Sequence, residues 1–118
     1  MEAQEREIEY YETEDGERPF QKWLSALKDK QGRQKIRTRI DRVSLGNLGF
    51  CEPVGEGVME LKIDFGPGYR VYFGQVGNKL VILLNGGDKG SQHKNIKTAH
   101  EYWANYRRRY DKKESKLS

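Results

Sequence analysis

The chain has 118 residues, of which 35% are hydrophobic and 34% are charged. This length predicts one compact domain with a small core, and it is too short for two. The single Cys51 excludes an intramolecular disulfide framework, no apolar run is long enough to cross a membrane, and the acidic N-terminus is unlike a signal peptide. We therefore expect a cytoplasmic protein.

Charge is distributed unevenly along the chain. Residues 1–19 contain eight acidic and two basic side chains, a net charge of −6, and residues 20–118 contain ten acidic and twenty basic ones, a net charge of +10. A basic body attracts polyanions, chiefly nucleic acid, through phosphate contacts and counterion release. The alternative interpretation is a solvated surface, since many soluble proteins are basic.

The first half of the sequence predicts a strand and two helices. The strand is Ile8–Tyr11, and Pro19 then suits the first turn of a helix. The apolar stripe of this helix consists of Phe20, Trp23, Leu24 and Leu27. Gly32 separates it from a second helix, whose stripe consists of Ile36, Ile40 and Val43. Two helices with a short link predict an antiparallel helical hairpin.

The second half predicts three strands and a last helix. Residues 46–57 are expected to form a loop, after which polar and apolar residues alternate in Met59–Phe65 and Tyr69–Phe73. Gly77-Asn78 is a plausible two-residue hairpin turn before a third strand, Lys79–Asn85. The last helix begins near Ser91 or Gln92. The element order β-α-α-β-β-β-α predicts an α+β fold.

These turns imply a register for the three strands. Ile63 is expected opposite Val71, and Phe73 opposite Ile82, so that the apolar residues share one face. Arg70 would then lie between Asp64 and Asn85. The remaining residues of the polar face are Glu60, Lys62, Tyr72, Val81 and Leu83. A loop over residues 86–91 is expected to rise beside Arg70.

Two segments resemble the addiction module killer protein family, the HigB-like branch of the RelE/ParE toxin superfamily. They are MELKIDFGPGYRVYF at residues 59–73 and LLNGGDKGSQ at residues 83–92, the second followed by NIKTA at residues 95–99. The likeness extends over roughly residues 8 to 106. The family pattern usually has arginine where Lys62 stands.

The resemblance implies a RelE-like fold, in which a small antiparallel sheet carries a helical hairpin on one face. Residues 1–118 would form a single toxin domain with a basic C-terminal tail from about residue 107. The implied activity is that of a type II toxin–antitoxin toxin, an endoribonuclease that cuts mRNA on the ribosome. It would need no metal or other cofactor. A cognate antitoxin with a helix-turn-helix domain, encoded by the neighbouring gene, would silence it.

Two other functions remain open. One is a ParE-like toxin that poisons DNA gyrase and has no nuclease activity. The other is a non-catalytic module that binds nucleic acid or protein. Both fit the basic charge, and the first also shares the fold, which by itself does not establish function.

Metal-free RNA cleavage requires a base for the 2′-hydroxyl, a cation for the phosphorane and an acid for the 5′-oxygen. Arg70 is the best candidate for the cation, and its structural alternative is an ion pair with Asp64. Lys89 follows a glycine-rich loop that can approach phosphate closely, unless it is a solvated lysine. His93 is a candidate acid or base, since histidine titrates near neutral pH, or an ordinary surface residue.

The candidates for RNA binding are Lys62, Tyr72, Gln92 and Lys94. Tyr72 could stack on a base, although packing against Leu83 explains it equally well. The basic run from Arg107 to Lys113 has two interpretations of equal weight, a segment that binds ribosomal RNA and a solvated tail.

Overall fold

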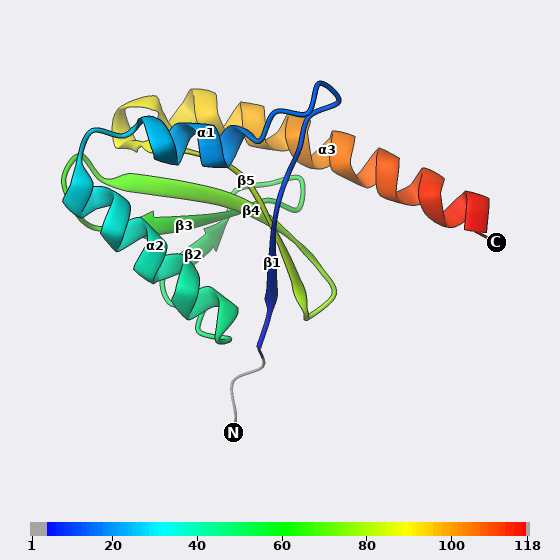
Figure 1. Cartoon of the computed structure of the whole chain (residues 1–118), viewed down its shortest axis with the longest axis horizontal. Helices are drawn as coiled ribbons and strands as arrows, with labels where there is room; N and C mark the ends of the chain where they lie inside the picture. Colours follow the sequence, from blue (N-terminus) through cyan, green and yellow to red (C-terminus); the bar gives the residue numbers. More distant parts are fainter. Residues whose placement is uncertain (1–4, 118) are drawn as a thin grey trace.

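The computed structural model describes the backbone of residues 5–117 and the side chains of residues 5–110. In chain order the elements are β1 (Glu7–Tyr10), α1 (Pro19–Ala26), α2 (Lys30–Ser44), β2 (Cys51–Pro53), β3 (Met59–Ile63), β4 (Tyr69–Val76), β5 (Leu80–Asp88), the 3-10 turn η1 (Lys89–Ser91) and α3 (Gln92–Leu117) (Figure 1). The α+β class is confirmed, with a five-stranded sheet and three helices in the described part of the chain. None of these helices is long and apolar enough to span a membrane.

The sheet has the strand order β1-β5-β4-β3-β2. Neighbouring strands from β2 to β5 are antiparallel, whereas β1 pairs with β5 in parallel, with Glu7 opposite Leu80. The sheet is therefore mixed, and the expectation of a purely antiparallel sheet was wrong. It also gains a strand, β2, inside the predicted loop over residues 46–57. Three residues that end in proline are too few to show the alternation of a strand.

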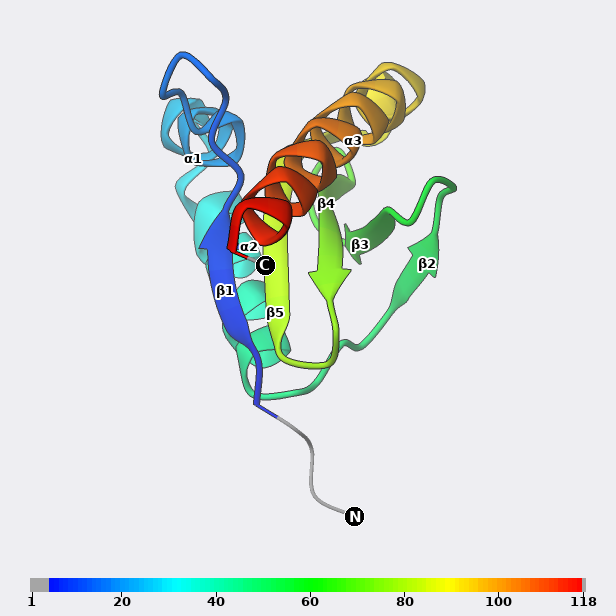
Figure 2. The same cartoon turned by 90° about the vertical axis from the view of Figure 1, so that its right-hand side faces the viewer.

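Helices cover both faces of the sheet (Figures 1 and 2). On one face, α1 and α2 share a core with the strands, to which they contribute Phe20, Leu24, Ile36 and Val43. On the other face, α3 packs Ala99 and Trp103 against Val58, Tyr72, Ile82 and Leu84. The predicted placement of the helical pair on one face is confirmed, and α3 adds a second core.

The start of α2 is tied to the sheet through its capping residue. Asp29 Oδ1 accepts a hydrogen bond of 2.9 Å from the Gly32 backbone N–H, and Asp29 Oδ2 accepts one of 2.8 Å from the Tyr69 hydroxyl. Gly32 was expected to separate the two helices, but it lies inside α2. A Cβ there would come within 2.6 Å of Asp29 Oδ2, so the close approach of these groups requires glycine.

The predicted register between β4 and β5 was wrong by one residue from Phe73 to Val76, and by two from Tyr69 to Tyr72, because the pairing shifts between Tyr72 and Phe73. The connection has three residues, 77–79, so Val76 lies opposite Leu80 and Phe73 opposite Leu83. A shift of one residue exchanges the faces of a strand. Val81 and Leu83 consequently face α1 and α2, while Ile82 and Leu84 face α3.

The predicted register between β3 and β4 was wrong by two residues, which leaves the faces unchanged. The connection has five residues, 64–68, and it places Ile63 opposite Tyr69. Arg70 therefore lies between Lys62 on β3 and Gly87 on β5, not between Asp64 and Asn85. The glycine pair at residues 86 and 87 belongs to β5, although the sequence analysis assigned it to a loop.

Candidate nucleic-acid interface

Two adjacent rows of residues cross the sheet on the face covered by α3. The outer row consists of Phe50, Lys62, Arg70 and Gly87, and the inner row of Glu52, Glu60, Tyr72 and Asn85. Paired residues on neighbouring strands project to the same side of a sheet, so each row presents its side chains together. The predicted polar face thus contains Glu60, Lys62, Arg70 and Tyr72, as expected.

The inner row is centred on a buried carboxylate. Glu60 is only 1% exposed, and its Oε2 accepts hydrogen bonds from the Tyr72 hydroxyl at 3.0 Å and from Gln92 Nε2 at 2.8 Å. Burial, together with this bond to Glu60, raises the pKa of Tyr72 well above its usual range. The phenol therefore stays protonated and acts as a donor. These bonds tie the first residue of α3 to the sheet.

Arg70 connects the inner row to the outer one. Its Nε lies 3.9 Å from Glu60 Oε1, and the two side chains are 12% and 2% exposed. Arg70 Nη1 makes only long contacts of 3.4 Å to the carbonyl oxygens of Gly68 and Tyr69, and Nε makes no hydrogen bond within the described residues. The guanidinium is thus oriented by the charge of Glu60, while its hydrogen-bonding capacity is incompletely used.

Lys62 is held in a similar way, but closer to solvent. Its Nζ donates to Glu52 Oε1 at 2.9 Å and lies 5.4 Å from the ring centroid of Phe50. Phe50 itself is 65% exposed. Together with Asp64, these two residues and Arg70 line an open pocket of about 330 Å³. Two cations and an exposed aromatic ring suit a nucleotide, whose phosphate and base they can contact.

The other predicted site residues do not line this pocket. Lys89 is exposed in η1, and Gly68 separates it from Arg70, since a Cβ on Gly68 would lie 3.5 Å from both Lys89 Cβ and Arg70 Nη1. His93 and Lys94 are exposed in the first turn of α3.

Tyr72 and Gln92 act on the pocket indirectly, because both donate hydrogen bonds to Glu60. Tyr72 is fully buried, so its ring packs in the core and only its hydroxyl acts, through Glu60. Gln92 is half-buried and turned toward the same carboxylate.

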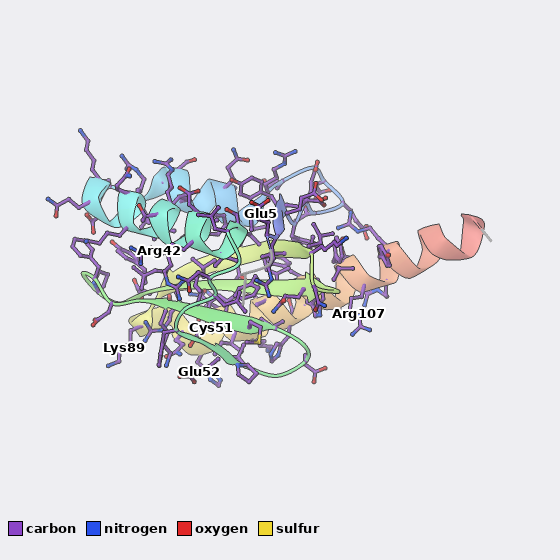
Figure 3. All side chains as sticks on the ribbon, turned by 90° about the horizontal axis from the view of Figure 1, so that it is seen from below. Glu5, Arg42, Cys51, Glu52, Lys89 and Arg107 are labelled. Atoms are coloured by element: carbon purple, nitrogen blue, oxygen red, sulfur yellow. The ribbon has the colours of Figure 1, made fainter. Side chains whose placement is uncertain are left out.

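The basic C-terminal run is partly engaged with the N-terminal segment. Arg109 donates to the Glu12 carbonyl oxygen at 2.5 Å and lies 5.5 Å from the Tyr11 ring centroid, while Arg107 and Arg108 are exposed. The side chains of Lys112 and Lys113 lie outside the described residues. Figure 3 shows Lys89 and Arg107 far apart, so this run is remote from the Arg70 pocket.

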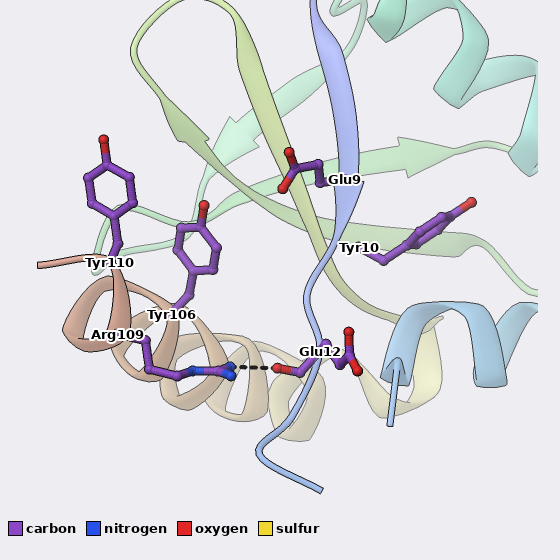
Figure 4. Close-up of a pocket in the computed structure, with 6 residues that line it drawn as sticks. All are labelled: Glu9, Tyr10, Glu12, Tyr106, Arg109 and Tyr110. Carbon is purple, nitrogen blue, oxygen red and sulfur yellow. Dashed lines mark hydrogen bonds between the residues drawn. The ribbon is translucent and has the colours of Figure 1, made fainter. Parts of the chain in front are cut away.

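A separate hollow of about 270 Å³, remote from the Arg70 pocket, lies between β1 and α3 (Figure 4). Its lining contains the carboxylates of Glu9 and Glu12 and a single cation, that of Arg109 from the basic run, which already donates to Glu12. It is therefore a poorer candidate for binding a polyanion. Within residues 5–110, no group of three or more His, Cys, Asp or Glu side chains could hold a metal ion.

Sequence reasoning missed two residues of the site. Glu60 was placed on the polar face without a role, because a carboxylate that alternates with apolar residues looks the same whether it is solvated or buried. Its register position beside Tyr72 is the signal that could have identified it. Phe50 was not singled out, since a lone aromatic residue in a loop has no periodicity.

Comparisons with known proteins agree with a toxin family. The family described as phage derived protein Gp49-like (DUF891) matches residues 22–111. A Haemophilus influenzae protein that bears the name "Uncharacterized protein" is 50% identical over 80 residues, which cover 68% of this chain and 81% of that protein. No solved structure matches significantly. The chain belongs to the phage-derived Gp49-like family, which is in general a family of RelE-like toxins.

Proposed function

We propose that this protein is the HigB-like toxin of a type II toxin–antitoxin pair, with a RelE-like fold, and that it inhibits translation by cleaving mRNA on the ribosome. The observation that carries the proposal is the Arg70 pocket. Lys62 and Arg70 are neighbours across β3 and β4, each is oriented by a carboxylate of the inner row, and both line the same open hollow.

In the proposed reaction the 2′-hydroxyl attacks the adjacent phosphate and expels the 5′-oxygen of the next nucleotide. The products are a 2′,3′-cyclic phosphate and a 5′-hydroxyl end. Arg70 stabilises the charge of the phosphorane, because a guanidinium can contact two of its oxygens. Lys62 neutralises a neighbouring phosphate. No metal is required for these steps.

We assign proton transfer to exposed side chains in η1 and at the start of α3. His93 at the start of α3 serves as an acid or base, and Lys89 beside Gly68 adds positive charge or donates a proton. Gln92 and Tyr72 act indirectly, since they hold Glu60, which in turn orients Arg70. Lys94 contributes a phosphate contact from the surface of α3.

Primer extension on cellular RNA after brief induction tests the proposal. Cuts within translated codons are expected for the wild type, whereas intact messages with an SOS response would identify a gyrase poison instead. Arg70→Ala should reduce cleavage at least about 10²-fold, the usual effect of removing one preorganised donor to the transition state.

Arg18→Ala is the matched control for Arg70→Ala. Arg18 is about half exposed just before α1, 3.8 Å from Glu12, and 6.0 Å from the ring centroid of Tyr10 in β1, the edge strand opposite β2. It should cleave like the wild type. If Arg70→Ala keeps its native circular dichroism and also cleaves at the wild-type rate, Arg70 is not catalytic.

The proposal includes a partner. A toxin must be silenced in its own cell, and we propose an antitoxin with a helix-turn-helix domain, encoded by the adjacent gene. Copurification from the native locus tests this. A chain that is harmless when expressed alone, with no adjacent gene product bound to it, would contradict the toxin assignment.

A further inference from the structure

The Arg70 pocket continues into a second hollow on the other side of β3. This hollow has a volume of about 350 Å³ and is lined by Gln34, Lys35, Thr38, Arg39, Arg42, Lys62, Ile63 and Asp64. Lys62 and Asp64 line both hollows. The short strand β2 pairs with residues 59–61 of β3, and one further bond joins the Lys62 N–H to the Phe50 carbonyl oxygen. The edge of β3 is therefore open from Ile63 onward, beside the lining that the two hollows share.

The joined hollows are strongly basic. Their lining contains five cationic side chains, those of Lys35, Arg39, Arg42, Lys62 and Arg70, and a single carboxylate, that of Asp64. Lys62 and Arg70 are paired with Glu52 and Glu60, which lie outside this lining. The cations of α2 form no ion pair with the described residues, so their positive charge is left to attract a polyanion. The width of one open strand edge, rather than a broad flat patch, favours a single strand over a duplex.

Phe50 is an exposed aromatic ring held in place beside these cations. Arg39 Nη2 donates to the carbonyl oxygens of Leu48 at 2.6 Å and Phe50 at 3.3 Å, and the Lys62 backbone N–H also donates to the Phe50 carbonyl at 3.4 Å. The loop is therefore fixed by α2 and β3. A ring that is 65% exposed and yet held on a fixed backbone has the properties of a platform for stacking.

We propose that Phe50 is the stacking platform of a track for unpaired RNA, which runs from the Arg70 pocket over the open edge of β3 to the basic face of α2. One base stacks on the ring, as in other single-strand binding sites, while the cations contact successive phosphates. The track binds the message segment that flanks the bond to be cut. It rests on the proposed function for the identity of this RNA, but binding can be measured without cleavage.

The test uses a fluorescently labelled, unstructured 12-nucleotide RNA with 2′-O-methyl groups, which cannot be cleaved, and fluorescence anisotropy. Phe50→Ala should raise the Kd about 5- to 150-fold, the usual range for one lost stacking contact. Phe50→Trp should bind within about threefold of the wild type, since Trp also stacks on bases. Leu45→Ala is the matched control, because Leu45 is 62% exposed in the loop after α2, and its Kd should not change.

The contribution of charge is tested through the salt dependence of Kd. Each lost phosphate contact lowers the slope of log Kd against log salt by about 0.7 for a single strand, so Lys35→Gln/Arg42→Gln should lower it by about 1.4. The control is Lys22→Gln/Lys79→Gln, because both lysines are exposed and neither lines either hollow. This control should leave the slope unchanged.

Several results would overturn the track. They are an unchanged Kd for Phe50→Ala, equal slopes for the two double variants, and equally tight binding of a duplex RNA of the same length. A loss of affinity of Phe50→Ala for vacant ribosomes would also overturn it, since the ring would then serve ribosomal RNA. Wild-type binding without any ribosome-dependent cleavage would instead refute the proposed function and leave the track intact.

Discussion

The two faces of the sheet are held together by different kinds of contact. The face under α1 and α2 is packed with apolar side chains, among them Phe20, Ile36 and Phe73, all fully buried. The face under α3 has an apolar core around Trp103, but at the Gln92 end of the helix it buries the carboxylate of Glu60 and the amide of Asn85.

The difference indicates a division of labour. Burying a polar or charged group costs free energy unless hydrogen bonds compensate for it, whereas apolar contacts stabilise without such a cost. The first face therefore supplies stability, and the polar end of the second face holds charged groups in position. Substitutions on the two faces should then affect stability and activity in different proportions.

The largest change in stability is expected on the apolar face. Phe20 is completely buried and contacts both Tyr10 and Trp23, with ring centroids 6.0 and 5.8 Å apart. Phe20→Ala should lower the free energy of unfolding by about 3–5 kcal/mol, which is a large part of the 5–15 kcal/mol typical of a domain. Urea denaturation followed by circular dichroism measures it.

The control is again Leu45→Ala, an exposed substitution that should change the free energy of unfolding by less than about 0.5 kcal/mol. A loss of less than about 1 kcal/mol for Phe20→Ala would mean that this face is not the main source of stability.

The apolar face could largely be predicted from sequence, because alternation and helical spacing identify its members directly. The exception is β5, where four successive apolar residues, Val81–Leu84, give no sign of which face each occupies. Only the length of the turn decides this, and a three-residue connection in place of two reversed the assignment.

For the polar face, the sequence predicted which residues lie together but not how they contact one another. The sequence placed Lys62, Arg70 and Tyr72 together, since a register shift of two residues preserves the face. It could not show that Glu60 is buried, because the group that covers it, Gln92, lies 32 residues away on another element. Long-range contacts of this kind leave no local pattern.

Glu60, Tyr72, Gln92 and Arg70 form a polar cluster at this end of the face. A substitution in this cluster should affect activity more than stability. Glu60→Gln can still accept a hydrogen bond from Tyr72, so it should lower the free energy of unfolding by only about 1–2 kcal/mol. It removes the charge that orients Arg70, however, and should lower ribosome-dependent cleavage at least tenfold. Parallel denaturation and cleavage assays measure the two effects.

Val58→Ala is the control for Glu60→Gln, since Val58 is fully buried in the apolar core of the same face. It should cost a similar amount of stability and leave cleavage nearly unchanged. If the two variants lose activity in the same proportion to their stability, the polar cluster has no positioning role.

The smallest expected effect concerns Asp29, the charged group at the border of the apolar face. The hydrogen bond from the Gly32 N–H, followed by that from the Tyr69 hydroxyl, lowers the pKa of Asp29. A lowered folded-state pKa stabilises the protein above the pKa of the unfolded chain, about 3.9, and this stabilisation is lost as pH falls through the folded value.

Asp29→Asn keeps a good helix cap, so its Tm at pH 7 should lie within a few degrees of the wild type. Between about pH 5 and about pH 2 its Tm should fall less steeply, because the charge-dependent part is absent. Tyr69→Phe removes one of the two donors and should give an intermediate slope. If the Tm of the wild type and that of Asp29→Asn fall equally steeply with decreasing pH, the charge of Asp29 does not contribute to stability and the cap acts only through its hydrogen bonds.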